Sequence, residues 1–187
     1  MTQDWSGGSA TRRRAGACYQ NSMSKLVILR GPSGAGKSTV AQKLFEGATK
    51  PAVLIQQDYY RFIFKPAGGK LNSKSIHKMI KANTLAALED GYDVLLEGIY
   101  NVHSYSQTFK EIFTAHPAQN YMFTFDISFE ETLRRHRTKP NKDEWSESDM
   151  KDWYHPKDFM GYDFERVIPE AYSAAETVRK IQEVAGI

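Results

Sequence analysis

The stretch KLVILRGPSGAGKST, residues 25–39, joins an apolar run to a glycine-rich turn and then to a helical pattern. Residues 26–29 are continuously apolar, as expected of a strand that is buried on both faces of a sheet. Val40 and Leu44 lie on one face of a helix that begins at about Lys37. A strand, a turn and a helix in this order predict one unit of a parallel α/β sheet.

The turn itself matches G-x-x-x-x-G-K-[ST] in every fixed position. In such a turn successive backbone N–H groups point inward and bind a phosphate chain, and the following helix adds the positive end of its dipole. We expect Lys37 to bridge β- and γ-phosphates and the Ser38 hydroxyl to coordinate Mg²⁺. The alternative is a glycine-rich turn without a ligand. The predicted phosphate-binding residues are Gly31, Pro32, Ser33, Gly34, Ala35, Gly36, Lys37, Ser38 and Thr39.

Strand-like and helix-like stretches alternate through the rest of the chain, which predicts an α/β fold around a mostly parallel sheet. Capping-box patterns at residues 128–131 and 173–176 mark the starts of two helices. Residues 141–162 are polar and lack a clear period, so they are interpreted as an insertion or lid. Further strands are predicted at residues 53–55, 93–97, 121–127 and 166–168, and a long helix at 72–90.

Length and composition favour one globular domain. The chain has 187 residues, of which 41% are hydrophobic and 25% charged, and no apolar run approaches the ~18 residues of a membrane span. The net charge of +3 gives no argument for a nucleic-acid partner. The single cysteine, Cys18, fits a reducing cytoplasm. Residues 1–22 are predicted to be a disordered leader before a domain at 23–187, with a phosphate-binding basic arm as the alternative.

Two carboxylates follow predicted strands. Asp58 and Arg61 come just after the second strand, where ligands of an open parallel sheet bind. Asp58 can accept the proton of an attacking hydroxyl or hold a metal, and Arg61 can bind an anionic acceptor or the transferring phosphoryl group. Glu97 ends the third strand like a Walker B acid, which acts on Mg²⁺. The alternatives are a helix N-cap aspartate with a solvated arginine, and a strand-end carboxylate without a chemical role.

A third group of charges is Arg134, Arg135 and Arg137, near the end of the helix that opens at Ser128. A phosphoryl-transfer enzyme needs mobile positive charge to neutralise the transition state. Arg134 and Arg135 have glutamates four residues earlier, which offers plain helix pairing as the alternative. Arg137 has no such acid, so it is predicted to face the ligand, and Arg134 is predicted to contact the nucleotide.

Taken together, these residues resemble the P-loop small-molecule kinases of the zeta-toxin and chloramphenicol-phosphotransferase-like branch. The stretch DISFEETLRRHR, residues 126–137, is similar to bacterial kinase-like members of that group, and the resemblance covers residues 24–186. It implies a three-layer α/β/α sandwich with a parallel five-stranded sheet of order 2-3-1-4-5 and a small helical lid at about residues 134–162.

The same resemblance implies ATP and Mg²⁺ as cofactors and phosphoryl transfer to a hydroxyl of a small molecule. It places the catalytic base at Asp58 and adenine at residues 169–174. One departure is that residues 138–165 contain lysines but no arginine, so any lid arginine comes from the helix itself.

Three other classes compete with this reading. A GTPase would need Asn-Lys-x-Asp after a strand, and residues 141–144, NKDE, miss its last position. A polynucleotide 5′-hydroxyl kinase would need a basic groove, which the near-neutral charge outside the leader disfavours. A non-catalytic ATP-binding module would lack the base or the metal-side acid, yet Asp58 and Glu97 are both present.

The sequence does not identify the phosphoryl acceptor or the oligomeric state. Asn101 and His103 follow Glu97 and are candidates to line an acceptor pocket. An aromatic acceptor side, which would suit a ring-bearing or amphipathic substrate, and ordinary core packing explain the nearby aromatic residues equally well. These are Tyr59, Tyr60, Phe62, Phe64 and Tyr100.

Overall fold

Five parallel strands in the order β2-β3-β1-β4-β5 form the centre of the fold. The computed structural model describes residues 23–64, 73–138, 143 and 145–187. Its elements are β1 Lys25–Arg30, α1 Lys37–Glu46, β2 Ala52–Gln56, α2 Gln57–Phe62, α3 Ser73–Glu89, β3 Asp93–Gly98, α4 Val102–Ala115, β4 Gln119–Asp126, α5 Phe129–His136, α6 Glu147–Asp152, β5 Glu165–Pro169 and α7 Ala174–Ala185.

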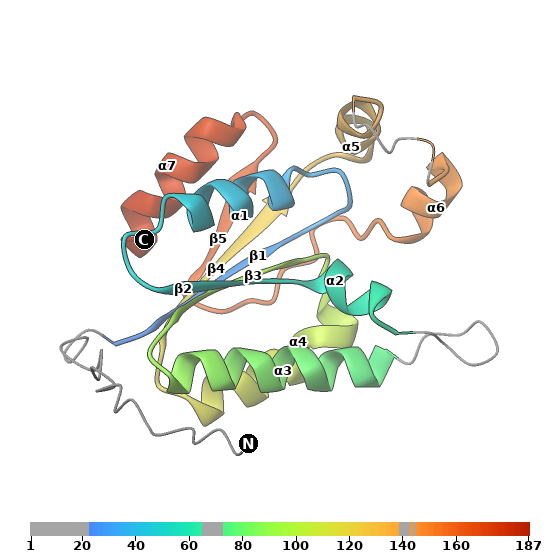
Figure 1. Cartoon of the computed structure of the whole chain (residues 1–187). Helices are drawn as coiled ribbons and strands as arrows, with labels where there is room; N and C mark the ends of the chain where they lie inside the picture. Colours follow the sequence, from blue (N-terminus) through green and yellow to red (C-terminus); the bar gives the residue numbers. More distant parts are fainter. Residues whose placement is uncertain (1–22, 65–72, 139–142, 144) are drawn as a thin grey trace, which may run out of the picture.

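Helices cover both faces of the sheet, as Figure 1 shows for α1 and α7 on one face and α3 and α4 on the other. Alternate residues of β1 supply the two cores because successive side chains of a strand point to opposite faces. Leu26 and Ile28 pack with the α3 and α4 side, and Val27 and Leu29 pack with the α1 and α7 side. The predicted three-layer sandwich and its strand order are therefore confirmed.

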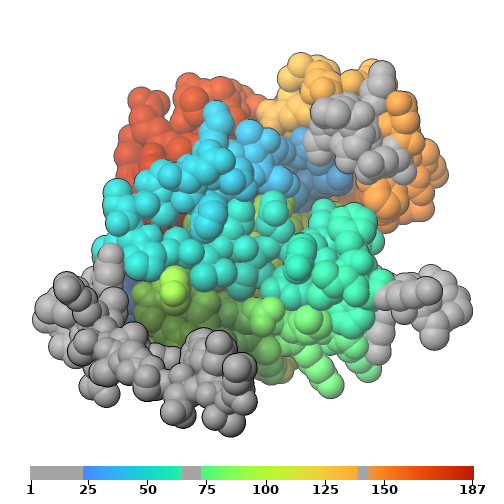
Figure 2. Space-filling view, in the orientation of Figure 1, coloured from blue at the N-terminus to red at the C-terminus, as the bar shows by residue number. Residues whose placement is uncertain are grey.

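The strand register brings the carboxyl ends of β1, β2, β3 and β4 to one edge of the sheet. Arg30 lies opposite both Gly98 and Thr124, and Gln56 lies opposite Glu97. Figure 1 shows α5 and α6 beyond this edge, and Figure 2 shows the blue surface of residues 31–38 beside the orange surface of α5 and α6. This edge is where the sequence analysis places its candidate site.

One short helix, α2, has no counterpart among the elements expected from the sequence, whereas a second, α6, lies where the resemblance implies a small helical lid. Each has six residues, which is too few for an apolar period to show. The start of α6 does carry a capping box, in which Ser146 and Asp149 exchange hydrogen bonds. It lies within the segment that was interpreted as an insertion or lid.

Several expectations fall outside the described part of the chain. These are the leader at 1–22 and the segment 139–142, which includes two of the lid lysines. Among the residues that are described, no helix combines the length and apolar character needed to cross a membrane.

Candidate active site

The loop between β1 and α1, here called the phosphate loop (residues 31–38), has the backbone shape that a phosphate chain requires. Gly31, Gly34 and Gly36 have φ of 139°, 82° and 93°, a region that favours glycine. A Cβ at Gly31 would lie 2.7 Å from the carbonyl oxygen of Phe125, and one at Gly34 would lie 2.8 Å from that of Thr132. The loop thus packs so closely against β4 and α5 that these two positions have no room for a side chain larger than that of glycine.

Lys37 is buried and reaches back across this loop. Its ammonium donates a 2.8 Å hydrogen bond to the carbonyl oxygen of Pro32. A cation held inside a turn of backbone N–H groups suits a phosphate chain, since both attract anionic oxygens. The residues of the loop therefore fit the nucleotide that the sequence motif predicts.

Glu97 lies beside Lys37 at the end of β3. Its side chain accepts a hydrogen bond from the Gln56 amide at 3.5 Å, and the Ser38 hydroxyl is near enough to lower the pKa of its carboxyl group. Glu97 is 6% exposed, and burial raises the pKa of its carboxyl group, while the positive charge of Lys37 lowers it and the negative charge of Asp58 raises it further. The structure thus brings together the hydroxyl and the carboxylate that were predicted to act on Mg²⁺.

These two oxygen donors suit Mg²⁺, which usually takes one or two carboxylates and completes its shell with water and substrate phosphates. Within the described ranges no group of three or more His, Cys, Asp and Glu side chains could hold a metal by itself. Ser38 and Glu97 would therefore hold the ion together with the nucleotide's own oxygens.

Asp58 lies in the first turn of α2, which begins directly after β2. The N-cap of α2 is Gln56, so Asp58 is not the capping residue that the alternative interpretation required. Its side chain is 68% exposed and lies 3.6 Å from the Arg61 guanidinium, which is 41% exposed. The negative charge of Asp58 raises the pKa of Glu97, so the two carboxylates lie near each other at the same edge of the sheet.

Arg61, the ion-pair partner of Asp58, lines a cleft of about 300 Å³, here called the acceptor cleft, and Asp58 itself is not among the lining residues. Gln57 shapes its floor, because its amide donates to the Tyr105 hydroxyl at 2.7 Å and accepts from the Ile99 N–H at 2.8 Å. The cleft is lined by Gln57, Arg61, Ser73, Ile76, His77, Ile99, Asn101, Ser104, Tyr105, Asp152, Trp153 and His155. Asn101 was expected here from the sequence, whereas His103 is not among the lining residues.

The aromatic residues expected on the acceptor side do not line this cleft. Tyr60 and Tyr100 are buried in the core, and Phe64 packs against it. Tyr59 and Phe62 are 64% and 77% exposed. Core packing and exposure to solvent account for all five, and the rings in the cleft belong instead to His77, Tyr105, Trp153 and His155.

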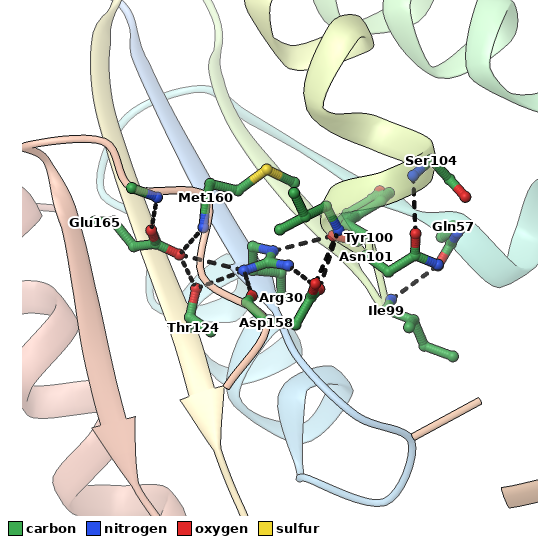
Figure 3. Close-up of polar contacts among 12 residues, drawn as sticks. Arg30, Gln57, Ile99, Tyr100, Asn101, Ser104, Thr124, Asp158, Met160 and Glu165 are labelled. Carbon is green, nitrogen blue, oxygen red and sulfur yellow. Dashed lines mark hydrogen bonds and ion pairs between the residues drawn. The ribbon is translucent and has the colours of Figure 1, made fainter. Parts of the chain in front are cut away.

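A buried cation, Arg30, organises the same edge of the sheet (Figure 3). It is fully buried at the end of β1, next to Gly31. Its Nε donates to the Tyr100 carbonyl at 3.0 Å, and its two Nη atoms pair with Asp158 at 2.5 Å and with Glu165 at 3.2 Å. Burial lowers the pKa of the Arg30 guanidinium, and the two carboxylates oppose this effect.

The partners of Arg30 continue the network into neighbouring segments. Asp158 also accepts the N–H of Val102 at 3.0 Å, at the start of α4. Glu165 accepts the Thr124 hydroxyl at 2.5 Å and the backbone N–H groups of Met160 and Gly161. One side chain thus ties β1 to β4, β5, the turn after β3 and the segment after α6 that carries His155.

Of the three arginines on α5, Arg135 is the one that the structure brings to the phosphate loop. Its guanidinium donates to the Ala35 carbonyl at 2.9 Å, to the Glu170 carbonyl at 2.8 Å and to the Glu131 carboxylate at 2.6 Å. Arg135 also lines a small hollow with Pro169, Tyr172 and Ala174. That hollow coincides with the predicted adenine position.

Arg134 and Arg137 have different surroundings. Arg134 is 69% exposed, and both of its described hydrogen bonds go to Glu131. Arg137 is exposed and ends α5 as its C-cap. Their assignments to the nucleotide and to catalysis stay predictions. Spacing on the helix could not separate these residues from Arg135, because the contact with Ala35 spans two distant parts of the chain.

Fold and loop together define a P-loop α/β protein. The model of the family described as AAA domain matches residues 26–157, and the chain belongs to that family. No curated protein matches the sequence significantly.

Solved structures give the same fold. APS kinase of Mycobacterium tuberculosis, solved in complex with AMPPNP and APS, has a TM-score of 0.66 and 16% identity over 88% of this chain and 99% of its own. A gluconokinase of Sinorhizobium meliloti has a TM-score of 0.63 and 17% identity, covering 89% of this chain and 94% of its own. A sugar kinase of Janibacter has a TM-score of 0.61 and 12% identity, covering 88% and 95%.

Replacing Arg30 with methionine should strongly destabilise the fold. The carboxylates of Asp158 and Glu165 would lose their buried cation, which costs about 3–5 kcal/mol of unfolding free energy. Urea unfolding measures this loss. The matched control is Arg179→Met, since Arg179 is 66% exposed and lies 3.9 Å from Glu183, and it should change stability by less than about 0.5 kcal/mol. Equal losses in both variants would contradict the organising role of Arg30.

The ADP affinities of two arginine variants test which of these arginines contacts the nucleotide. Arg135→Ala should weaken ADP binding by about ten-fold, because a planar cation beside the phosphate loop and the hollow predicted to hold adenine is lost. Arg134→Ala should leave the ADP affinity nearly unchanged. Isothermal titration of both variants measures the difference, and the opposite order would restore the nucleotide contact predicted for Arg134.

Proposed function

We propose that the protein is an ATP-dependent kinase that transfers the γ-phosphoryl group to a hydroxyl of a small molecule. The observation that carries this proposal is the meeting of three features at one edge of the sheet. The phosphate loop, the buried Glu97 and the exposed Asp58, whose partner Arg61 lines the acceptor cleft, lie where β1, β2 and β3 end. The kinase names of the similar structures support the reaction class.

Each residue has a role that follows from its position. When a nucleotide binds, the Lys37 ammonium leaves the Pro32 carbonyl and binds phosphate oxygens. The phosphate oxygens are negatively charged, so they bind a cation more strongly than a neutral carbonyl does. Ser38 and Glu97 would hold Mg²⁺, which when bound neutralises charge on the phosphates. Asp58 accepts the proton of the acceptor hydroxyl, and Arg61 neutralises charge on the group in transfer.

The acceptor cleft supports a small substrate. It is lined by residues of α2, α3, α4 and the segment around Trp153 and His155. We place the chain, within this proposal, near the zeta-toxin and chloramphenicol-phosphotransferase-like kinases and in the cytoplasm. The first placement is supported by residues 126–137 and the second by the single cysteine.

Lys37→Ala tests the nucleotide site. The variant loses the ammonium that lies across the loop, so ATP affinity should fall by at least about ten-fold, the usual effect of a lost hydrogen bond to a charged group. Turnover of ATP should fall below detection. Lys43→Ala, in the last turn of α1, is the control and should bind ATP as the unchanged protein does. Undiminished ATP affinity in Lys37→Ala would refute the phosphate-loop assignment.

The two carboxylates are separated by a pair of Mg²⁺ titrations at saturating ATP. Asp58→Asn should lower turnover by ~10²–10⁴, the span of general-base catalysis, with ATP affinity nearly intact. Glu97→Gln should instead raise the Mg²⁺ concentration for half-maximal activity, since a neutral amide binds a hard cation poorly.

The acceptor for these titrations comes from an ATP-consumption screen of nucleosides, sugars, antibiotics and nucleic-acid ends. A large change in Mg²⁺ demand for Asp58→Asn, with none for Glu97→Gln, would reverse the two roles. Full activity in both variants would refute the mechanism.

A further inference from the structure

A second hollow adjoins the acceptor cleft. It is a groove of about 490 Å³ between α3 and α4, here called the α3–α4 groove, and it shares His77 and Ser104 with the cleft. Both volumes are in the range of small-molecule sites, roughly 300–1,000 Å³. Its lining residues are Lys74, His77, Lys78, Lys81, Ser104, Gln107, Thr108 and Glu111. A ligand in the cleft can therefore extend past His77 and Ser104 into the groove.

The charge of this groove is mainly positive. Three lysines from α3 line it, against the single carboxylate of Glu111 from α4. Glu111 is already satisfied, because it accepts the Lys81 ammonium at 2.6 Å and the Gln107 amide at 3.0 Å. These hydrogen bonds lower the pKa of Glu111, so the carboxylate is ionised and paired at neutral pH.

Lys78 differs from Lys81 in having no ion-pair partner among the residues that the structure describes. It is exposed, one helical turn from Lys74 and close to Lys81 along the same side of α3. His77 does not contribute to this positive charge, because burial lowers the pKa of its imidazole and favours the neutral form. Its ring packs against Tyr105, with the ring centroids 4.1 Å apart. The excess positive charge of the groove thus comes from the lysines.

We propose that the α3–α4 groove binds an anionic group, a phosphate monoester or a carboxylate, on the compound whose hydroxyl enters the acceptor cleft. This inference rests on the proposed kinase function and specifies its substrate class. Lysine suits such a group because its ammonium is a flexible point charge with three donors. The hydroxyl of Ser104, at the junction of the two hollows, is a further donor to the same group.

A small anion fits this groove better than a nucleic acid. A polynucleotide gains affinity by pairing a row of cations with successive phosphates. In the groove that row is interrupted, because Lys81 is already neutralised by Glu111. The favoured acceptor therefore carries its negative charge on one terminal group rather than along a backbone.

The first experiment measures binding without any need for turnover. The protein is saturated with ADP and Mg²⁺ to fill the phosphate loop and is then titrated with inorganic phosphate, followed by backbone amide NMR shifts. We expect saturable shifts at residues 74–81 and 104–111, and an affinity that falls as KCl is added. Shifts that do not saturate, or that occur only around residues 31–38, would overturn the proposal.

A charge-reversal variant with a matched control identifies the lysine. Lys78→Glu should weaken phosphate binding by about three- to ten-fold, as expected for an exposed charge contact and its reversal. Lys43→Glu, an equal change of charge on α1 at the other face of the sheet, should not weaken it. Both variants are first checked for ADP affinity. Equal phosphate affinity in the two variants would overturn the role of the groove.

The second experiment compares acceptors in pairs: glycerol with glycerol 3-phosphate, ribose with ribose 5-phosphate, and a short oligonucleotide with a 5′-hydroxyl. We expect higher kcat/KM for the phosphorylated member, and loss of that preference in Lys78→Glu. Preference for the neutral member or for the oligonucleotide would overturn the proposal. Failure to bind ADP would refute the kinase function itself, whereas failure of phosphate binding with ADP bound refutes only the groove.

Discussion

The guanidinium of Arg30 is a full positive charge inside the protein, and its burial imposes a constraint on every segment around it. A charge without partners in this position would be very costly, so the fold must supply carbonyl and carboxylate oxygens from several directions. They come from the turn after β3, from β4, from β5 and from the segment that contains Asp158. Because Arg30 directly precedes the phosphate loop, the same group that satisfies the charge also fixes where the loop begins.

The two carboxylates of the candidate site have different surroundings. Glu97 is buried between Lys37, Ser38 and Gln56, a setting that suits a carboxylate held beside a cation. Asp58 is 68% exposed at the start of α2, where a proton can leave to water after it has been accepted. The two carboxylates thus lie within the same field but differ in access to solvent. This difference is the physical basis for assigning metal chemistry to one and proton transfer to the other.

The acceptor side shows how a local field can differ from the charge of the whole chain. The net charge is +3, and it gave no argument for a nucleic-acid partner. Yet the α3–α4 groove brings three lysines together, and it leaves only the paired carboxylate of Glu111 opposite them. Lysines separated by three or four residues on a helix share one side, so a small excess of charge becomes concentrated there. The total charge cannot reveal such a concentration, because acids elsewhere on the surface balance it.

Features that depend on near neighbours in the chain were predictable from the sequence alone. The buried strand at residues 26–29, the phosphate loop, the N-cap at Ser128 and the capping box at Ser173 all rest on hydrogen bonds or periods within a few residues. The second half of the box predicted at Ser128 is wrong, because the Ser128 N–H donates to the distant Glu170 rather than to Glu131. The family resemblance added the strand order, and the position of Glu97 near the end of β3 followed from the apolar run before it. Arg30 offered no such signal. Its partners Thr124 and Glu165 are 94 and 135 residues away, so they become neighbours only when the sheet has formed.

The choice of Arg135 over Arg134 and Arg137 also belongs to the tertiary structure, as does the burial of Tyr60 and Tyr100 away from the acceptor cleft. A sequence pattern places these residues on an element, but the direction in which a side chain points is set by how that element packs. The local sequence was therefore enough to predict the phosphate loop. The packing of distant segments decided which arginine contacts the loop and which residues line the acceptor cleft, because those contacts have no counterpart in the spacing of the chain.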